Sequence, residues 1–154
     1  MKIIKIDLTI KEQTVVITQD SEIIGIYIGK GDSKLTTKLN VVHNSPNLRS
    51  LTKIKAVVFD NSSFDMIGNL VILKGANNTD AYLRIDALMM SSTAKARVVP
   101  GLEITENDVK GGHGATVGRV NKEQLFYLRS RGISVMEAEK ILVEGFLSDV
   151  AAKM

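Results

Sequence analysis

The chain has 154 residues, of which 44% are hydrophobic, 24% are charged and only 2 are proline. This composition excludes a disordered chain, because the apolar surface suffices to offset the entropy lost on folding, and the length suits one domain with a helical appendage. The 20 Lys and Arg residues against 17 Asp and Glu give a net charge of +3 that is mixed along the chain, which argues against a nucleic-acid-binding protein.

The first ten residues predict a strand rather than a targeting segment. Lys2, Lys5 and Asp7 alternate with isoleucines there, and the continuous apolar stretch of a signal peptide is missing. No stretch of the chain approaches the roughly 18 apolar residues that a membrane span needs. We therefore expect a cytoplasmic protein that does not bind membranes.

Short bursts of β-branched residues, separated by turn residues, indicate that strands dominate up to about residue 120. The expected strands cover residues 3–10, 14–18, 23–28, 39–43, 54–59, 70–73 and 81–90, with weaker ones near Val98, Ile104 and Val117. Turns are expected where Gly, Asn, Asp and Pro gather, at residues 29–32, 44–47, 75–78 and 111–112.

This spacing suits either a β-sandwich or a solenoid whose coils each contribute two short strands. Two details favour the solenoid. The two-residue Asn-Gly and Asp-Gly hairpins of an antiparallel meander are missing, and residues 56–59 are apolar at consecutive positions, as in strands buried on both faces. No exact internal repeat is visible, so the sandwich stays an alternative.

After Val120 the pattern predicts two helices. Asn121 is placed to cap a helix of about ten residues that begins at Lys122 and stops at Gly132. Ser134 opens a second helix that runs to about residue 152, with an apolar face formed by Ala138, Ile141, Leu142, Gly145 and Phe146. Residues 125–128 are four adjacent apolar side chains, which either wedge between the strands and the last helix or meet a partner protein.

The chain is poorly equipped to hold a metal by itself. It has no cysteine, so it supplies no disulfide and no thiolate ligand, and its only histidines are His43 and His113. Glu103, Glu106 and Asp108 precede His113 and would serve as further ligands only if folding brought them together. Most isolated histidines are structural.

The glycine-rich segment at residues 108–118 does not match a nucleotide-binding loop. Its four glycines indicate close backbone approach or positive φ angles, but the Lys-Ser or Lys-Thr ending of a phosphate-binding loop is missing. The hydroxyl pairs at 62–63 and 91–93 stand outside any nucleophile elbow. We therefore expect a protein that is not an enzyme.

Several strings in the second half of the chain resemble the SufB/SufD family. They are Pro100, residues 102–104, 108–110 and 113–118, and residues 125–133, which read Leu-Phe-Tyr-Leu-Arg-Ser-Arg-Gly-Ile. The likeness continues upstream through His43, Pro46, Lys55 and residues 74–76, 79–82 and 88–91, so it covers roughly residues 40–150. No single physical requirement would produce so many matches at once, so the resemblance of the C-terminal stretch is specific to this family.

The resemblance implies a role in the SUF system, which assembles iron–sulfur clusters. It implies a mainly β fold, a short parallel β-helix (a single-stranded, right-handed solenoid) in residues 1–120 with a two-helix segment in residues 121–154. Family members pair through the β-helix, B with D or like with like, and dock an ABC-type ATPase subunit with their C-terminal helices. Exposed coil ends also need a cap or a partner, so we expect a dimer with a second SufB/SufD-type chain or with itself.

Two candidate sites follow from the resemblance. His113 matches the histidine near the pair interface at which a nascent cluster forms. The ATPase-docking side chains fall on the two helices and are Leu125, Phe126, Tyr127, Arg129, Arg131, Ile141 and Phe146.

The differences between this sequence and the family pattern limit the role that we expect for the chain. Relatives are usually about two to three times longer and commonly carry cysteine where Gly111 stands, whereas this chain has none. We therefore expect no cofactor bound by this chain alone, and a transient iron–sulfur cluster only in a complex, to which His113 supplies at most one nitrogen ligand. Gly114 is typical of a D-like partner rather than of the scaffold. The alternative is a family paralogue without a cluster role that acts as a structural or regulatory homodimer.

Overall fold

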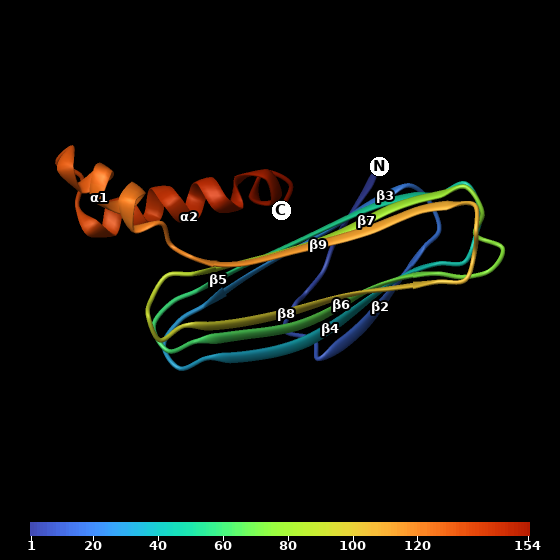
Figure 1. Ribbon diagram of the computed structural model, residues 1–154, viewed down its shortest axis with the longest axis horizontal. Coiled ribbons are helices and arrows are strands. Elements are labelled where there is room, and N and C mark those ends of the chain that lie inside the picture. Colours follow the sequence, from blue (N-terminus) through green and yellow to red (C-terminus); the bar gives the residue numbers. More distant parts are fainter.

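The computed structural model describes residues 1–154, with nine strands followed by two helices (Figure 1). Five strands form one sheet in the order β1-β3-β5-β7-β9 and four form a second in the order β2-β4-β6-β8, and every pair is parallel. The strands are β1 Lys2–Lys5, β2 Glu12–Ile17, β3 Ser21–Gly29, β4 Lys34–His43, β5 Arg49–Val58, β6 Ser63–Ile72, β7 Thr79–Met89, β8 Lys95–Ile104 and β9 Val109–Arg119.

The chain alternates between the two sheets, so it winds into a parallel β-solenoid of about four turns. Side chains on neighbouring coils meet although they are 29 to 31 residues apart, as in the Asn69–Asn40 and Asn78–Asn47 hydrogen bonds. This confirms the predicted solenoid and excludes the sandwich, because a sandwich would pair its strands antiparallel. The sequence shows no exact repeat because many other stacked pairs differ in residue type, as Thr37 with Met66 and Lys38 with Ile67 do.

The core lies between the two sheets. In β6, Phe64, Met66, Leu70 and Ile72 are fully buried, and buried residues alternate with half-buried ones along the whole strand, so one side of the strand faces the core and the other faces solvent. Each such side chain contributes about 1.5–3 kcal/mol through the apolar surface it removes from water. The inward positions of neighbouring coils stack into continuous apolar rows.

The N-terminal end of this core is closed by the chain itself. Between β1 and β2 the chain crosses from one sheet to the other (Figure 1). Leu8 in this crossing is only 3% exposed and packs into the main core together with Ile6. Gly25 makes room for both, because a Cβ there would lie 3.0 Å from Ile6 and 3.3 Å from Leu8. Thr37 donates its hydroxyl to the Ile10 carbonyl at 2.7 Å and ties the crossing to β4.

Three of the four predicted turns are confirmed. Gly31 and Gly75 have φ angles of 62° and 95°, and Asn47 has a φ of 61°, which is the left-handed conformation expected of these residues in turns. The turn predicted at 111–112 is wrong, since both glycines lie inside β9. The weak bursts near Val98 and Ile104 belong to a single strand, β8.

Both helices begin where their caps predict. The helix α1, Lys122–Ser130, starts at Asn121, whose side chain accepts hydrogen bonds from the Glu123 and Gln124 amides at 2.9 and 3.0 Å. The helix α2, Val135–Ala151, starts at Ser134, and Gly132 between them has the expected positive φ of 86°. Neither helix has the length and apolar character needed to cross a membrane.

The helix α2 packs on the outer face of the five-stranded sheet, over β3 and β5 (Figure 1). Its buried residues are Ala138, Leu147 and Val150, so the predicted apolar face is partly wrong: Ile141 and Gly145 are exposed. The face is rotated because Leu147 inserts against Val57 and Met90. The expected wedge of α1 between strands and last helix is also wrong, because α1 packs on α2 and has no buried residue.

Candidate functional site

The C-terminal end of the solenoid is open. β8 and β9 are the last strands of their sheets, so each has one edge of unpaired backbone groups. Their inward side chains continue the core rows but have no further coil above them. Leu102 is 41% exposed although it stacks on the fully buried Leu70, and Val117 is 43% exposed although it stacks on the buried Ala87. This end therefore presents a core surface to solvent.

His113 lies on this open end. It pairs in register with Leu83, which is fully buried, so His113 occupies an inward-facing row of the core and is exposed only because β9 is the last strand. No group of three or more His, Cys, Asp or Glu side chains in the chain is arranged to hold a metal ion. His113 therefore lies exposed at an uncovered end of the solenoid, outside any such group.

The carboxylates that precede His113 are not gathered around it. The Glu106 carboxylate accepts hydrogen bonds from the backbone amides of Gly75 and Asn107, both at 2.9 Å. These bonds lower the pKa of its carboxyl. Glu103 is exposed on β8, and Asp108 lies in the loop before β9. The structure therefore leaves His113 without a carboxylate partner from its own chain.

None of the glycines of β9 has a positive φ, and three of them, Gly111, Gly112 and Gly114, allow close approach of neighbouring side chains. A Cβ at Gly111 would lie 2.7 Å from Ile104 inside the open coil. On the outer side, a Cβ at Gly112 or Gly114 would lie 3.0 or 2.7 Å from Tyr82. Tyr82 thus lies close to the outer face of β9 at these two glycines. Of the two explanations that the sequence suggested for the glycines, close approach is confirmed at these positions and positive φ is wrong.

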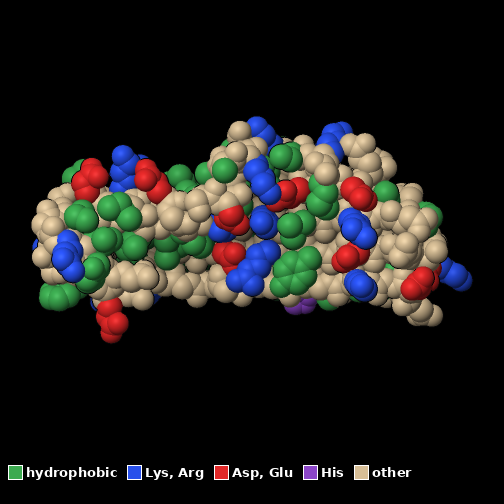
Figure 2. Space-filling model, turned by 90° about the horizontal axis from the view of Figure 1, so that it is seen from above, with side chains coloured by type: hydrophobic (Ala, Val, Ile, Leu, Met, Phe, Trp, Pro, Cys, Tyr) green, Lys and Arg blue, Asp and Glu red, His purple; other side chains and the backbone are tan.

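The helix α1 carries most of the candidate docking residues. Phe126 is 74% exposed and Tyr127 is 57% exposed, and the Arg131 guanidinium lies 5.3 Å from the Tyr127 ring centre. Arg129 is exposed on the same helix, while Leu125 is half-buried. Apolar side chains accordingly gather over the helical end of the molecule, whereas mixed charges cover the sheet beside it (Figure 2).

The two candidates on α2 lie in different settings. Ile141 is exposed and lines a hollow between α1, α2 and the end of β9. Phe146 is half-buried and anchors α2 to the sheet, with the Lys55 ammonium 4.9 Å from its ring centre. The structure therefore does not gather all seven residues into one patch: Phe146 positions the helix, and α1 with Ile141 forms the free surface.

Charged residues that the sequence reading missed hold α2 in place. Lys55 donates to the Phe146 carbonyl and to the Asp149 carboxylate, both at 2.6 Å, and Lys153 donates to both oxygens of the buried Glu22 at 2.7 Å. Burial alone would raise the pKa of Asp149, but hydrogen bonds and charges from Lys55 and Lys53 outweigh it and lower that pKa. These partners are 91 to 131 residues apart, so no local pattern reveals them.

The fold and the site together define a class, the parallel β-solenoid with one open end and a C-terminal helix pair on its outer face. A family model described as SUF system FeS cluster assembly, SufBD core domain, matches residues 5–146. The chain belongs to the SufB/SufD family of the SUF iron–sulfur cluster assembly system.

Curated relatives agree with this family. An iron–sulfur cluster assembly SufBD family protein of Mycobacterium tuberculosis is 32% identical over 143 residues, which cover 88% of this chain and 36% of the relative. A second such protein, of Mycobacterium bovis, is 31% identical over 133 residues, covering 86% of this chain and 16% of the relative. The iron–sulfur cluster assembly protein SufD of Escherichia coli is 35% identical over 114 residues, covering 74% and 27%. The chain therefore spans about a third or less of the length of these relatives.

Proposed function

We propose that this chain is a non-catalytic subunit of the SUF iron–sulfur cluster assembly machinery, closer to the D-type partner than to the scaffold. In this proposal residues 1–120 form a β-helix core that pairs with a second chain, and residues 121–154 form a helical segment that docks an ABC-type ATPase. The observation that carries it is the open end of the solenoid, where a core surface and His113 are both uncovered.

Pairing through the open end is supported by its chemistry. Inward apolar side chains such as Leu102 and Val117 lose contact with water when a second open end covers them, and the unpaired edges of β8 and β9 gain hydrogen-bond partners. The second chain is another SufB/SufD-type protein or a copy of this one. His113 then becomes enclosed between the two chains, in a position to offer one nitrogen to a cluster that is cargo rather than a resident cofactor.

The ATPase is proposed to bind the free surface of α1. An exposed Phe and Tyr flanked by Arg129 and Arg131 have the composition of residues that dominate protein interfaces. These side chains project from a short helix that does not take part in the core, so binding there leaves the solenoid undisturbed.

Point substitutions test this docking better than truncation, because removing α2 would expose the cluster of Val57 and Met90 on the sheet. We expect the double substitution Phe126→Ser with Tyr127→Ser to weaken binding to the SUF ATPase of the same organism at least tenfold, measured by calorimetry on the purified chain. Tyr82→Ser, which removes an exposed aromatic ring from the sheet, is the matched control and should bind as the wild type does.

Unchanged binding of the double variant would contradict docking at α1. If the intact chain does not bind the ATPase at all, the paralogue that acts as a structural or regulatory homodimer becomes the better interpretation, and the lack of cysteine is the feature that favours it.

A further inference from the structure

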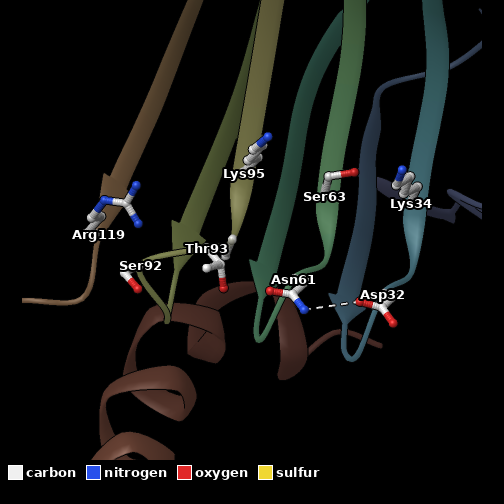
Figure 3. Close-up of a pocket in the computed structure, with 9 residues that line it drawn as sticks. Asp32, Lys34, Asn61, Ser63, Ser92, Thr93, Lys95 and Arg119 are labelled. Atoms are coloured by element: carbon white, nitrogen blue, oxygen red, sulfur yellow. Dashed lines mark hydrogen bonds between the residues drawn. The ribbon is translucent and has the colours of Figure 1, made fainter.

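A hollow of about 900 Å³ lies where three successive loops enter the four-stranded sheet. Lys34, Ser63 and Lys95 are the first residues of β4, β6 and β8 and stand side by side in register. The loop before β8 adds Ser92, and Arg119 at the end of β9 stands beside Ser92, at the side of the hollow away from Lys34 (Figure 3). The lining is therefore rich in hydrogen-bond donors and contains a single apolar residue.

The cations of this hollow form no ion pair. Lys34 and Lys95 take part in none of the ion pairs that the other basic residues of the sheets form. Arg119 is anchored by one bond from Nη1 to the Ser91 carbonyl at 2.6 Å, which leaves its other N–H groups free. The one carboxylate of the lining, Asp32, accepts a hydrogen bond from Asn61 at 3.2 Å.

The next row of residues in the same sheet contains a carboxylate, which the row of Lys34, Ser63 and Lys95 lacks. Two residues further along the strands, Asp65 of β6 lies beside Arg97 of β8 and accepts hydrogen bonds from its guanidinium at 3.0 and 3.2 Å. In the first row the position on β6 is occupied by Ser63, which carries no charge, between two lysines. One row is thus neutralised within the chain, and the other keeps its full positive charge.

We propose that this hollow binds a small anion with two or three linked phosphate groups. Neighbouring strands lie about 4.8 Å apart, so Lys34 and Lys95, two strands apart, rise from backbone positions separated by about 10 Å. A single phosphate would require both lysines and Arg119 to converge on one point, whereas a chain of phosphates meets each of them where it stands. The guanidinium and the hydroxyls of Ser63 and Ser92 add directional donors to phosphate oxygens. This site goes beyond the assembly role and does not depend on it.

Calorimetric titration of the full chain with pyrophosphate and tripolyphosphate, in low-salt buffer, tests the proposal. We expect both to bind more tightly than orthophosphate or sulfate, and to bind more weakly as salt is raised from 50 to 200 mM. The double substitution Lys34→Gln with Lys95→Gln should weaken the affinity at least tenfold. ADP that binds as tightly as pyrophosphate would identify a nucleotide as the ligand, and weaker ADP binding would identify a free oligophosphate.

The matched control is Lys74→Gln with Lys110→Gln, which removes the same charge from loops and strands outside the hollow and should leave the affinity unchanged. Thermal melts of both double variants establish that the fold is kept. The proposal is wrong if pyrophosphate binds no better than sulfate, or if the two double variants lose the same affinity, because net charge rather than a site would then be responsible.

Discussion

The two ends of the solenoid differ in how the chain covers the core. A parallel β-helix ends in open strand edges and an uncovered core at each side. At the N-terminal end the chain crosses over the core and inserts Leu8 beside Gly25. At the C-terminal end nothing covers Leu102, Val117 or His113, because the chain leaves β9 and places α2 on the outer face of earlier coils. The comparison teaches that one end of the core is covered by the chain itself, whereas the last coil at the other end stays exposed.

The largest effect is expected at the closed end. Leu8→Ala removes a nearly fully buried side chain from the crossing and should lower the free energy of unfolding by about 3 kcal/mol. Urea denaturation followed by circular dichroism measures this. Ile10→Ala, in the same crossing but exposed, should cost less than about 1 kcal/mol. Equal losses from both variants would show that the crossing does not act as a cap.

A smaller effect, of a different kind, is expected at the open end. Val117→Asp places a charge on the exposed core surface, so pairing with a second chain should weaken at least tenfold, about 1.4 kcal/mol, as measured by sedimentation over a concentration series. The unfolding free energy of the monomer should stay close to that of the wild type. A wild-type monomer at high micromolar concentration, with or without a B-type chain, would contradict pairing at this end.

The smallest effect contrasts the two histidines. His43 is fully buried between the Ile17 and Ile72 positions and its Nε2 lies 2.7 Å from the Ser50 hydroxyl, and burial lowers its pKa. Above about pH 6.5 it is neutral in both folded and unfolded chains. As the pH falls below that value, the unfolded chain binds the proton first, so stability is lost until the folded-state pKa is passed.

Unfolding free energies measured between pH 7.5 and 5 check this contrast. His43→Gln should flatten the acid side of the profile, because the buried imidazole with the lowered pKa is then gone. The effect of His113→Gln is expected instead in the iron retained by the assembled complex. A His43→Gln variant that keeps the wild-type slope would contradict the prediction, because the buried imidazole would then not be the group that lowers stability at acid pH.

Much of the fold was accessible from the sequence, because strands and caps are local. Alternating apolar residues in β6, and Asn121 and Ser134 at the helix starts, act on their immediate neighbours. The predictions that were wrong concern residues whose structure depends on contacts with distant parts of the chain. Gly111 and Gly112 have turn chemistry but lie in β9, where they make room for Ile104 and Tyr82 of other strands.

The candidate site was accessible only in part, for the same reason. The exposure of Leu102 follows from its place in the last coil, and no property of the residue itself reveals it. The attachment of α2 depends on Lys55 and Glu22, which meet Asp149 and Lys153 across most of the chain. The resemblance supplied the family, while the separation of Phe146 from the α1 surface required the structure.

The attachment of α2 has a mechanical consequence. The helix lies along β3 and β5 and is fastened at two separate points, Asp149 on Lys55 and Lys153 on Glu22. A pull on α1 along the helix axis loads both fastenings and the buried Leu147 in shear at the same moment, whereas a peeling force would break them one after another. In the proposed assembly, a displacement of α1 by the ATPase would therefore be passed to the five-stranded sheet as a whole, and through its hydrogen-bonded strands to the edge of β9 that carries His113.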